Sequence, residues 1–357
     1  MDERNEIAPL AARRHDPPMD FAIPTRFTRL GRIVGFGAER GTIINGDPCI
    51  VWDEAEHAWR MFYFCLPPGH AQALCSGDPA TAANWRELGP LTFTNADALP
   101  DGIAIKPFVV LDPHRPNRAA HIDGRHCLVL VTNFRRREVR RAWSDTLAGP
   151  WTLENEPIVA PGDDDAIDAK HVEAPSAYWF ADRKAFVYFY MATPKNPQGR
   201  AASPLGSCQA AAIQHLHEPR ARKLGSVLLP SPVPNHWTAG WIGGLQLVGR
   251  RGSGWVALIN AGANAPTVGD TAITQDEPPP SLGGFAVTDD PNAVTGWRAL
   301  DEPIERIDDI PADALANGEG TNLWRHHLLA LPDGRRLIFY NSGAYAREQL
   351  FAKRADN

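Results

Sequence analysis

Two carboxylates stand at the entrance to apolar, aromatic-rich segments of this 357-residue chain. Glu173 lies near the start of HVEAPSAYWFADRKAFVYFYM (171–191), and Asp47 lies in GDPCIVWD (46–53). A charge at such a position is costly unless it is paired or used. Two carboxyl groups can break a glycosidic bond, because one protonates the leaving oxygen while the other activates water or attacks. We therefore predict Asp47 and Glu173 as a catalytic pair.

Residues this far apart in the sequence can meet if the chain folds as a repeat. The sequence contains five units of about 50 to 65 residues, each with four short apolar or aromatic segments separated by turns. The first unit spans residues 47–93 and the second 106–159, while the fifth ends one strand short. The segment RFTRLGRIVGFG (26–37) is predicted to supply the missing strand.

Such a repeat predicts an all-β, five-bladed β-propeller, in which each blade is a four-stranded antiparallel meander and an N-terminal strand closes the ring. We expect residues 26–357 to form this single domain and residues 1–25 to be a flexible N-terminal segment. A β-sandwich is the structural alternative, since it too has short strands at regular spacing.

The first strand of each propeller blade lines the central channel, so polar and aromatic residues at those strand starts converge. They form the predicted substrate-binding set: Asn45, Lys106, His171, Trp237, Trp241, Arg325, His326 and His327. The tryptophans offer flat faces on which a sugar ring can stack. The two adjacent histidines face opposite ways on a strand, so only one enters the channel, and the sequence leaves open which.

The blade-start motifs resemble those of the five-bladed propeller glycoside hydrolases, especially family 43, with relatives in families 32, 62, 117 and 130. The resemblance spans about residues 30–355. GDPCIVWD matches the segment that carries the family's Asp base or nucleophile, and VEAPSAYW matches the segment that carries its Glu acid. AWSDTLAGPW and HHLLALPDGRRLIFYN resemble its strand-turn signature and its fifth-blade segment with an inward histidine. The resemblance implies hydrolysis of a small sugar-containing substrate.

One position departs from the family pattern. Family 43 places a third Asp directly after the proline that begins blade two, and Phe108 stands there in IKPFVV. Asp101 or Asp168 could replace it, and we include Asp168 in the predicted catalytic set. Lys106 adds a cation, which indicates a carboxylate or phosphate on the substrate, although a lysine lying along a strand edge is the simpler interpretation.

Two alternative functions therefore stay open. The channel could be rebuilt for a biosynthetic tailoring reaction on a non-sugar anionic substrate, because a fold does not fix a function. The propeller could also be a non-catalytic ligand-binding protein, in which case replacing Asp47 and Glu173 would leave ligand affinity nearly intact.

Composition narrows the expected partners to a small molecule and leaves the oligomeric state open. The net charge is −6 and the only basic run is short, so nucleic acid is not expected. No apolar stretch approaches the ~20 residues of a membrane span, and the N-terminus lacks the core of a secretion signal, which favours a cytoplasmic protein. Five cysteines without CxxC spacing predict buried thiols, and no metal or nucleotide motif is present, so no metal or cofactor is expected.

Overall fold

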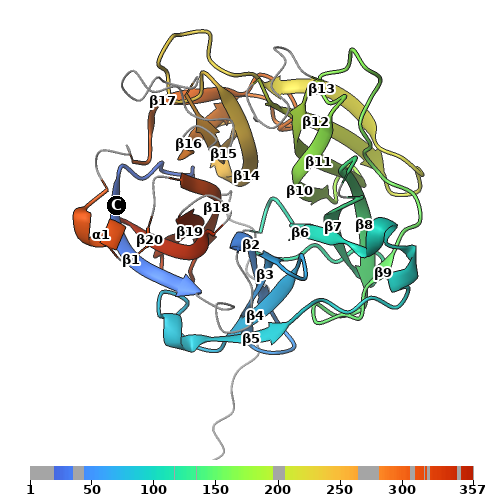
Figure 1. The fold of residues 1–357 in the computed structure, drawn as a ribbon, viewed down its shortest axis with the longest axis horizontal. Helices are drawn as coiled ribbons and strands as arrows, with labels where there is room; N and C mark the ends of the chain where they lie inside the picture. The colour runs from blue at the N-terminus through green and yellow to red at the C-terminus, as the bar shows by residue number, and fades with distance from the viewer. Residues whose placement is uncertain are drawn as a thin grey trace, which may run out of the picture.

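The computed structural model describes residues 20–34, 44–115, 117–133, 135–195, 206–263, 281–305, 310–316, 318–319, 322–343 and 347–356. The strands in these ranges form five four-stranded antiparallel sheets arranged as a ring (Figure 1). The predicted five-bladed β-propeller is therefore confirmed, and the sandwich alternative is wrong. In the described part of the chain, no helix has the length and apolar character that a membrane crossing needs.

In blades one to four the strands follow chain order from the inner to the outer strand. Blade one contains β2 (Ile44–Asp53), β3 (Ala58–Leu66), β4 (Ala71–Cys75) and β5 (Trp85–Gly89). Blade two contains β6 (Ala104–Val109), β7 (His126–Thr132), β8 (Glu138–Ser144) and β9 (Thr152–Leu153). Blade three contains β10 (His171–Phe180), β11 (Ala185–Thr193), β12 (Cys208–His215) and β13 (Arg222–Leu228).

The last two blades complete the ring. Blade four contains β14 (Trp241–Arg251), β15 (Gly254–Gly262), β16 (Leu282–Thr288) and β17 (Arg298–Pro303). Blade five contains β18 (Asn322–Ala330), β19 (Arg336–Gly343), β20 (Gln349–Asp356) and, as its fourth strand, β1 (Arg26–Val34). The connections carry 3-10 turns η2 (Ala82–Asn84), η3 (Ala96–Ala98) and η4 (Pro100–Gly102), and helix α1 (Ala312–Ala316).

The N-terminal strand closes the ring as predicted. β1 pairs antiparallel with β20, with Arg26 opposite Asp356. Just before it, the Phe21 backbone N–H donates to the Arg250 carbonyl at 2.6 Å, and the Phe21 ring lies 6.2 Å from that of Phe285. The segment from Phe21 to β1 is thus tied to blades four and five, and the five inner strands β2, β6, β10, β14 and β18 surround the centre (Figure 1).

Aromatic side chains fill the spaces within and between blades. Four tryptophans outside the inner strands are all buried, namely Trp59, Trp85, Trp151 and Trp297. The ring of Trp151, for example, meets the ring of Phe62 edge-on, with the centroids 6.1 Å apart. This packing across blades holds the inner strands at fixed separations, which is what a site made of several strands requires.

All five inner strands carry a β-bulge at an equivalent position. Pairing with the second strand slips between Gly46 and Cys49, Ile105 and Phe108, Glu173 and Ser176, Ile242 and Leu245, and Trp324 and His326. A bulge bends the strand and re-aims a side chain. The first residue inside each slip, directly after the last regularly paired residue, has a positive φ in four blades. The values are 50° at Asp47, 55° at Lys106, 51° at Ala174 and 23° at Arg325. Blade four has Gly243 there.

Ala174 allows a test of whether its positive φ strains the backbone. A left-handed conformation costs a non-glycine residue about 1 to 2 kcal/mol, which offsets the ~1 kcal/mol that glycine otherwise loses through unfolded-state entropy. We expect Ala174→Gly to leave the free energy of unfolding within about 0.5 kcal/mol of the native value or to raise it slightly. The matched change Ala177→Gly, in a buried regular part of β10, should lower it by about 1 kcal/mol. Urea unfolding measures both, and equal losses would rule out the strained bulge.

Candidate active site

Three inner strands bring together the two predicted carboxylates and a lysine. Asp47 comes from β2, Lys106 from β6 and Glu173 from β10. The Nζ atom of Lys106 lies 2.6 Å from Oε1 of Glu173 and 3.5 Å from Oδ2 of Asp47. Both carboxylates are buried, with 6% of Asp47 and 5% of Glu173 exposed. The predicted convergence of these three residues on one site is therefore present in the structure.

A second cation on Glu173 was missed by the sequence prediction. Arg137 sits in the turn between β7 and β8, and its Nη1 atom forms an ion pair with Oε2 of Glu173. The turn is fixed to β10, because the backbone N–H of Val172 donates to the Arg137 carbonyl at 3.2 Å. The basic run at 135–137 was visible in the sequence. Only the fold shows that its first two arginines are exposed while the third turns inward.

The charges around Glu173 fix its protonation state. Burial alone would raise the pKa of Glu173, but the cations Lys106 and Arg137 outweigh it and hold that pKa well below its ordinary value. Burial likewise opposes the charged form of Lys106, yet the two carboxylates raise its pKa. At neutral pH Glu173 is therefore an anion and Lys106 a cation.

Next to this cluster the surroundings are electropositive. Burial and, second, the charge of Arg137 lower the pKa of His171 to about 4. Burial and Arg137 also lower the pKa of Lys170. His171 is consequently neutral near pH 7, so the predicted binding residue His171 stands at the site as an uncharged imidazole.

Asp47 is held at its backbone while one side-chain oxygen stays available. Its N–H donates to Oδ1 of Asn341 at 3.2 Å. The Asn341 side chain lies against Gly46, where an added Cβ would come within 2.7 Å of it. The buried Oδ2 atom of Asp47 has no hydrogen-bond partner among the described residues beyond its ion pair with Lys106. That oxygen can accept a proton from water or attack a carbon atom.

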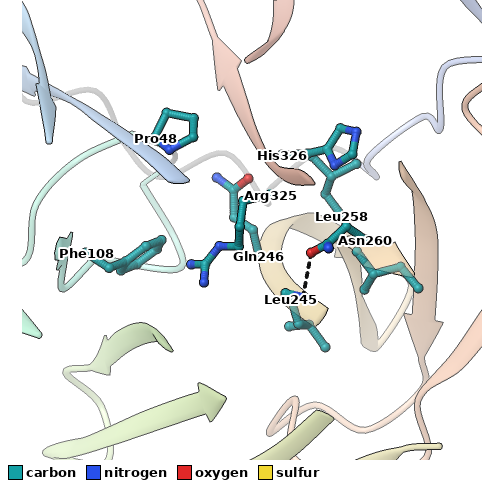
Figure 2. Close-up of a pocket in the computed structure, with 10 residues that line it drawn as sticks. Pro48, Phe108, Leu245, Gln246, Leu258, Asn260, Arg325 and His326 are labelled. Atoms are coloured by element: carbon teal, nitrogen blue, oxygen red, sulfur yellow. Dashed lines mark hydrogen bonds between the residues drawn. The ribbon is translucent and has the colours of Figure 1, made fainter. Parts of the chain in front are cut away.

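Arg325 crosses the centre of the ring. Its Nη2 donates to the carbonyl of Pro175 in the bulge of β10 at 2.9 Å, whereas Nη1 is buried with no hydrogen-bond partner in the described ranges. Beside it is a cavity of about 10 Å³, room for about one water molecule. The cavity is lined by Pro48, Phe108, Gly244, Leu245, Gln246, Leu258, Ile259, Asn260, Arg325 and His326. Figure 2 shows the guanidinium pointing toward Phe108.

Neither residue considered as the third carboxylate joins Asp47 and Glu173. Phe108 itself is buried against Tyr178, with ring centroids 6.1 Å apart, and so makes that wall of the cavity apolar. Asp101 is exposed in η4.

The predicted catalytic role of Asp168 finds no support in its surroundings. The carboxylate accepts from Lys223 at 2.6 Å, from the Tyr190 hydroxyl at 3.2 Å and from the Gly162 N–H at 3.0 Å. These three partners lie within blade three or the loop before it, and none contacts Glu173. Asp168 therefore anchors the loop that leads into β10.

The two adjacent histidines are now distinguished. His327 faces the centre, because Nε2 lies 3.1 Å from the Ile50 carbonyl on β2 and Nδ1 lies 3.2 Å from Nε2 of Gln246 on β14. Burial lowers the pKa of His327 to about 3, so its imidazole is neutral near pH 7. It links the inner strands β2 and β14 through these two contacts. His326 stacks on Tyr340 and borders the cavity (Figure 2). Since both nitrogens of His327 are engaged, the structure does not support the predicted substrate contact there.

The predicted stacking face needs a correction. Trp237 is buried in the core, and its Nε1 donates to the Leu300 carbonyl at 2.9 Å. Trp241 is fully buried and stacks on Trp324, with centroids 5.0 Å apart and planes at 30°. Trp324 is partly exposed and occupies in β18 the position that Glu173 occupies in β10, directly before the bulge. Trp324 is thus the more accessible indole of this stacked pair.

Asn45, another predicted binding residue, is buried and connects two blades. It is 1% exposed, and its Nδ2 donates to Oε1 of Gln349 on β20 at 2.8 Å. It therefore joins blade one to blade five.

The five cysteines are buried and unpaired, as expected. Within the described ranges, no three His, Cys, Asp or Glu side chains are grouped so as to hold a metal ion.

The fold is similar to that of solved propellers, glycoside hydrolases among them. The structure of a BT0996 RGII complex has a TM-score of 0.66 at 16% identity, covering 94% of this protein and 93% of the other. A thermostable family-43 glycoside hydrolase has a TM-score of 0.59 at 12% identity, with 87% and 88% covered. A family-62 α-L-arabinofuranosidase from Coprinopsis cinerea has 0.58 at 13%, with 93% and 97% covered. No protein-family model and no curated protein matches the sequence.

Proposed function

We propose that this protein is a glycoside hydrolase-like enzyme that cleaves a glycosidic bond of a small sugar-containing substrate with Asp47 and Glu173. The observation that carries the proposal is the buried cluster in which Lys106 joins carboxylates from two other blades. Several solved propellers with this fold are named as glycosidases, which supports the same reaction class. The fold itself permits other chemistry, so the proposal depends on the site.

The two carboxylates are suited to different roles. Oδ2 of Asp47 has no hydrogen-bond donor in the described part of the site other than the ammonium 3.5 Å away, which suits a base or nucleophile. Glu173 is ionised in the free protein, so it must gain a proton before it can act on the leaving oxygen. Trp324 would provide the face on which a sugar ring stacks.

The cations on Glu173 also favour a second candidate function. A carboxylate held as an anion by Lys106 and Arg137 is a poor general acid until something displaces them. A propeller of this kind could act on an anionic non-sugar substrate, or bind one without reaction. Either case predicts that no glycoside is hydrolysed.

Hydrolysis of nitrophenyl glycosides tests the proposal. The panel contains the arabinofuranoside, xyloside, fructoside, galactoside, mannoside, glucuronide and galacturonide, each with and without inorganic phosphate. We expect the native protein to cleave at least one, and Asp47→Asn to lower that kcat/KM by about 10²- to 10⁴-fold. Asp301→Asn, at an exposed aspartate of β17, is the matched control and should keep native activity. Silence across the panel by the folded protein, or full activity of Asp47→Asn, would refute the proposed function.

A further inference from the structure

The cations that pair with the two carboxylates indicate the kind of substrate. We infer that Lys106 and Arg137 form an anion-binding subsite, and that the substrate carries an acidic group, a carboxylate or a phosphate ester, beside the bond that is broken. This inference rests on the proposed function, because it names the substrate class of the same site.

The order in which an incoming ligand would meet these groups supports the inference. The side chains of Lys106 and Arg137 are 19% and 25% exposed, whereas those of Asp47 and Glu173 are 6% and 7% exposed. The side chains that carry the ammonium and the guanidinium are therefore more accessible to solvent than the two carboxylate side chains. A ligand reaches the cations first, and a guanidinium presents N–H donors in a geometry that matches a carboxylate or phosphate.

The charge of the cluster supports it as well. Lys106 and Arg137 both pair with Glu173, and Lys106 also lies near Asp47. A neutral sugar would have to displace these cations from the carboxylates without replacing their charge, which costs free energy in a buried site. An acidic substrate group would itself supply the negative charge that the cations need.

The same contact explains how Glu173 obtains its proton. The charged groups that face it are Lys106 on β6, Arg137 on the turn between β7 and β8, and Asp47 on β2, with the neutral His171 on its own strand. When an acidic group of the substrate binds the two cations, their attraction for Glu173 weakens and a further negative charge comes close. Both changes favour the protonated form of Glu173, which is the form that can donate to the leaving oxygen.

Matched glycosides test the subsite. The nitrophenyl glucoside, its glucuronide and its 6-phosphate differ only at carbon 6, and the galactose series gives the same comparison. We expect one acidic form to have a kcat/KM at least 10- to 100-fold above the neutral form, the range for hydrogen bonds to charged groups. Arg137→Gln should remove most of that preference, Arg137→Lys should restore part of it, and Arg86→Gln, at an exposed arginine of β5, should change nothing.

Calorimetric titration with free glucuronate, galacturonate, the sugar 6-phosphates and the neutral sugars separates the two proposals. If no glycoside is cleaved but an acidic sugar binds the native protein and not Arg137→Gln, the subsite is supported and the proposed hydrolysis fails. If neutral and acidic glycosides are cleaved equally well, hydrolysis is supported and the subsite is overturned. Acidic sugars that bind no better than neutral ones, with Arg137→Gln folded and unaltered, also overturn it.

Discussion

Replacing Glu173 with glutamine is expected to lower kcat/KM for the cleaved glycoside by about 10²- to 10⁴-fold. Glutamine keeps the shape of the side chain but cannot donate an acid proton to a leaving oxygen. Because a leaving group of low pKa needs little protonation, the loss should be smaller for a dinitrophenyl glycoside than for the methyl glycoside of the same sugar. Initial rates on these two substrates measure the difference, and equal losses would contradict a general-acid role.

The same substitution has a structural cost that needs its own control. Lys106 and Arg137 both lose their charged partner on Glu173, and removing one member of a buried ion pair costs about 3 kcal/mol. The folded pKa of Glu173 is depressed, so its contribution to stability is full above its unfolded pKa of ~4.3 and is lost as pH falls further. The destabilisation by Glu173→Gln should therefore be constant from pH 7 to about 5 and shrink below ~4. Thermal unfolding across that range measures it.

Replacing Lys106 with methionine should lower both the stability and the activity of the protein. Asp47 and Glu173 would lose the ammonium between them, and two buried carboxylates close together repel. We expect the free energy of unfolding to fall by about 2 kcal/mol at pH 7, less than for a lone buried charge because Arg137 still pairs with Glu173. Activity on an acidic glycoside should fall by about 10- to 100-fold.

The pH dependence of Lys106→Met distinguishes this account from simple loss of packing. Without the ammonium, burial and the neighbouring carboxylate raise the folded pKa of Glu173 above its unfolded value, so the variant gains stability relative to the native protein as pH falls from 7 to 5. Lys106→Arg keeps the charge and serves as the control. A deficit in Lys106→Met that stays the same from pH 7 to pH 5 would show that the lysine is not coupled to the carboxylates.

The sequence predicted the fold and part of the site best where its repeated pattern fixed the place of each strand in the ring. Short strands in five repeated units predicted the propeller, and a propeller brings its strand starts together, so Asp47, Lys106 and Glu173 could be placed at one site. The bulges also left a trace in the sequence. Proline follows the first residue inside the slip at Asp47, Lys106 and Ala174, where a bulge tolerates a residue without an N–H.

What the sequence could not supply was the environment of each side chain. Arg137 reaches Glu173 from a hairpin turn, and no inner-strand pattern includes that turn. Trp237 and Asp168 are residue types that often bind substrate or take part in catalysis. In this fold Trp237 instead bonds to blade four and Asp168 pairs with Lys223 of blade three. Trp324 was not selected, because the bulge that fixes the register of β18 is not marked by a proline.

A double-substitution cycle on the cleaved glycoside tests the central claim most directly. Residues that act as a unit in one reaction give strongly non-additive losses. If Asp47 and Glu173 work together, kcat/KM of Asp47→Asn/Glu173→Gln should be about the same as that of the slower single variant. Losses that multiply, or a single variant with native activity while both proteins remain folded, would contradict a shared catalytic role for the two carboxylates.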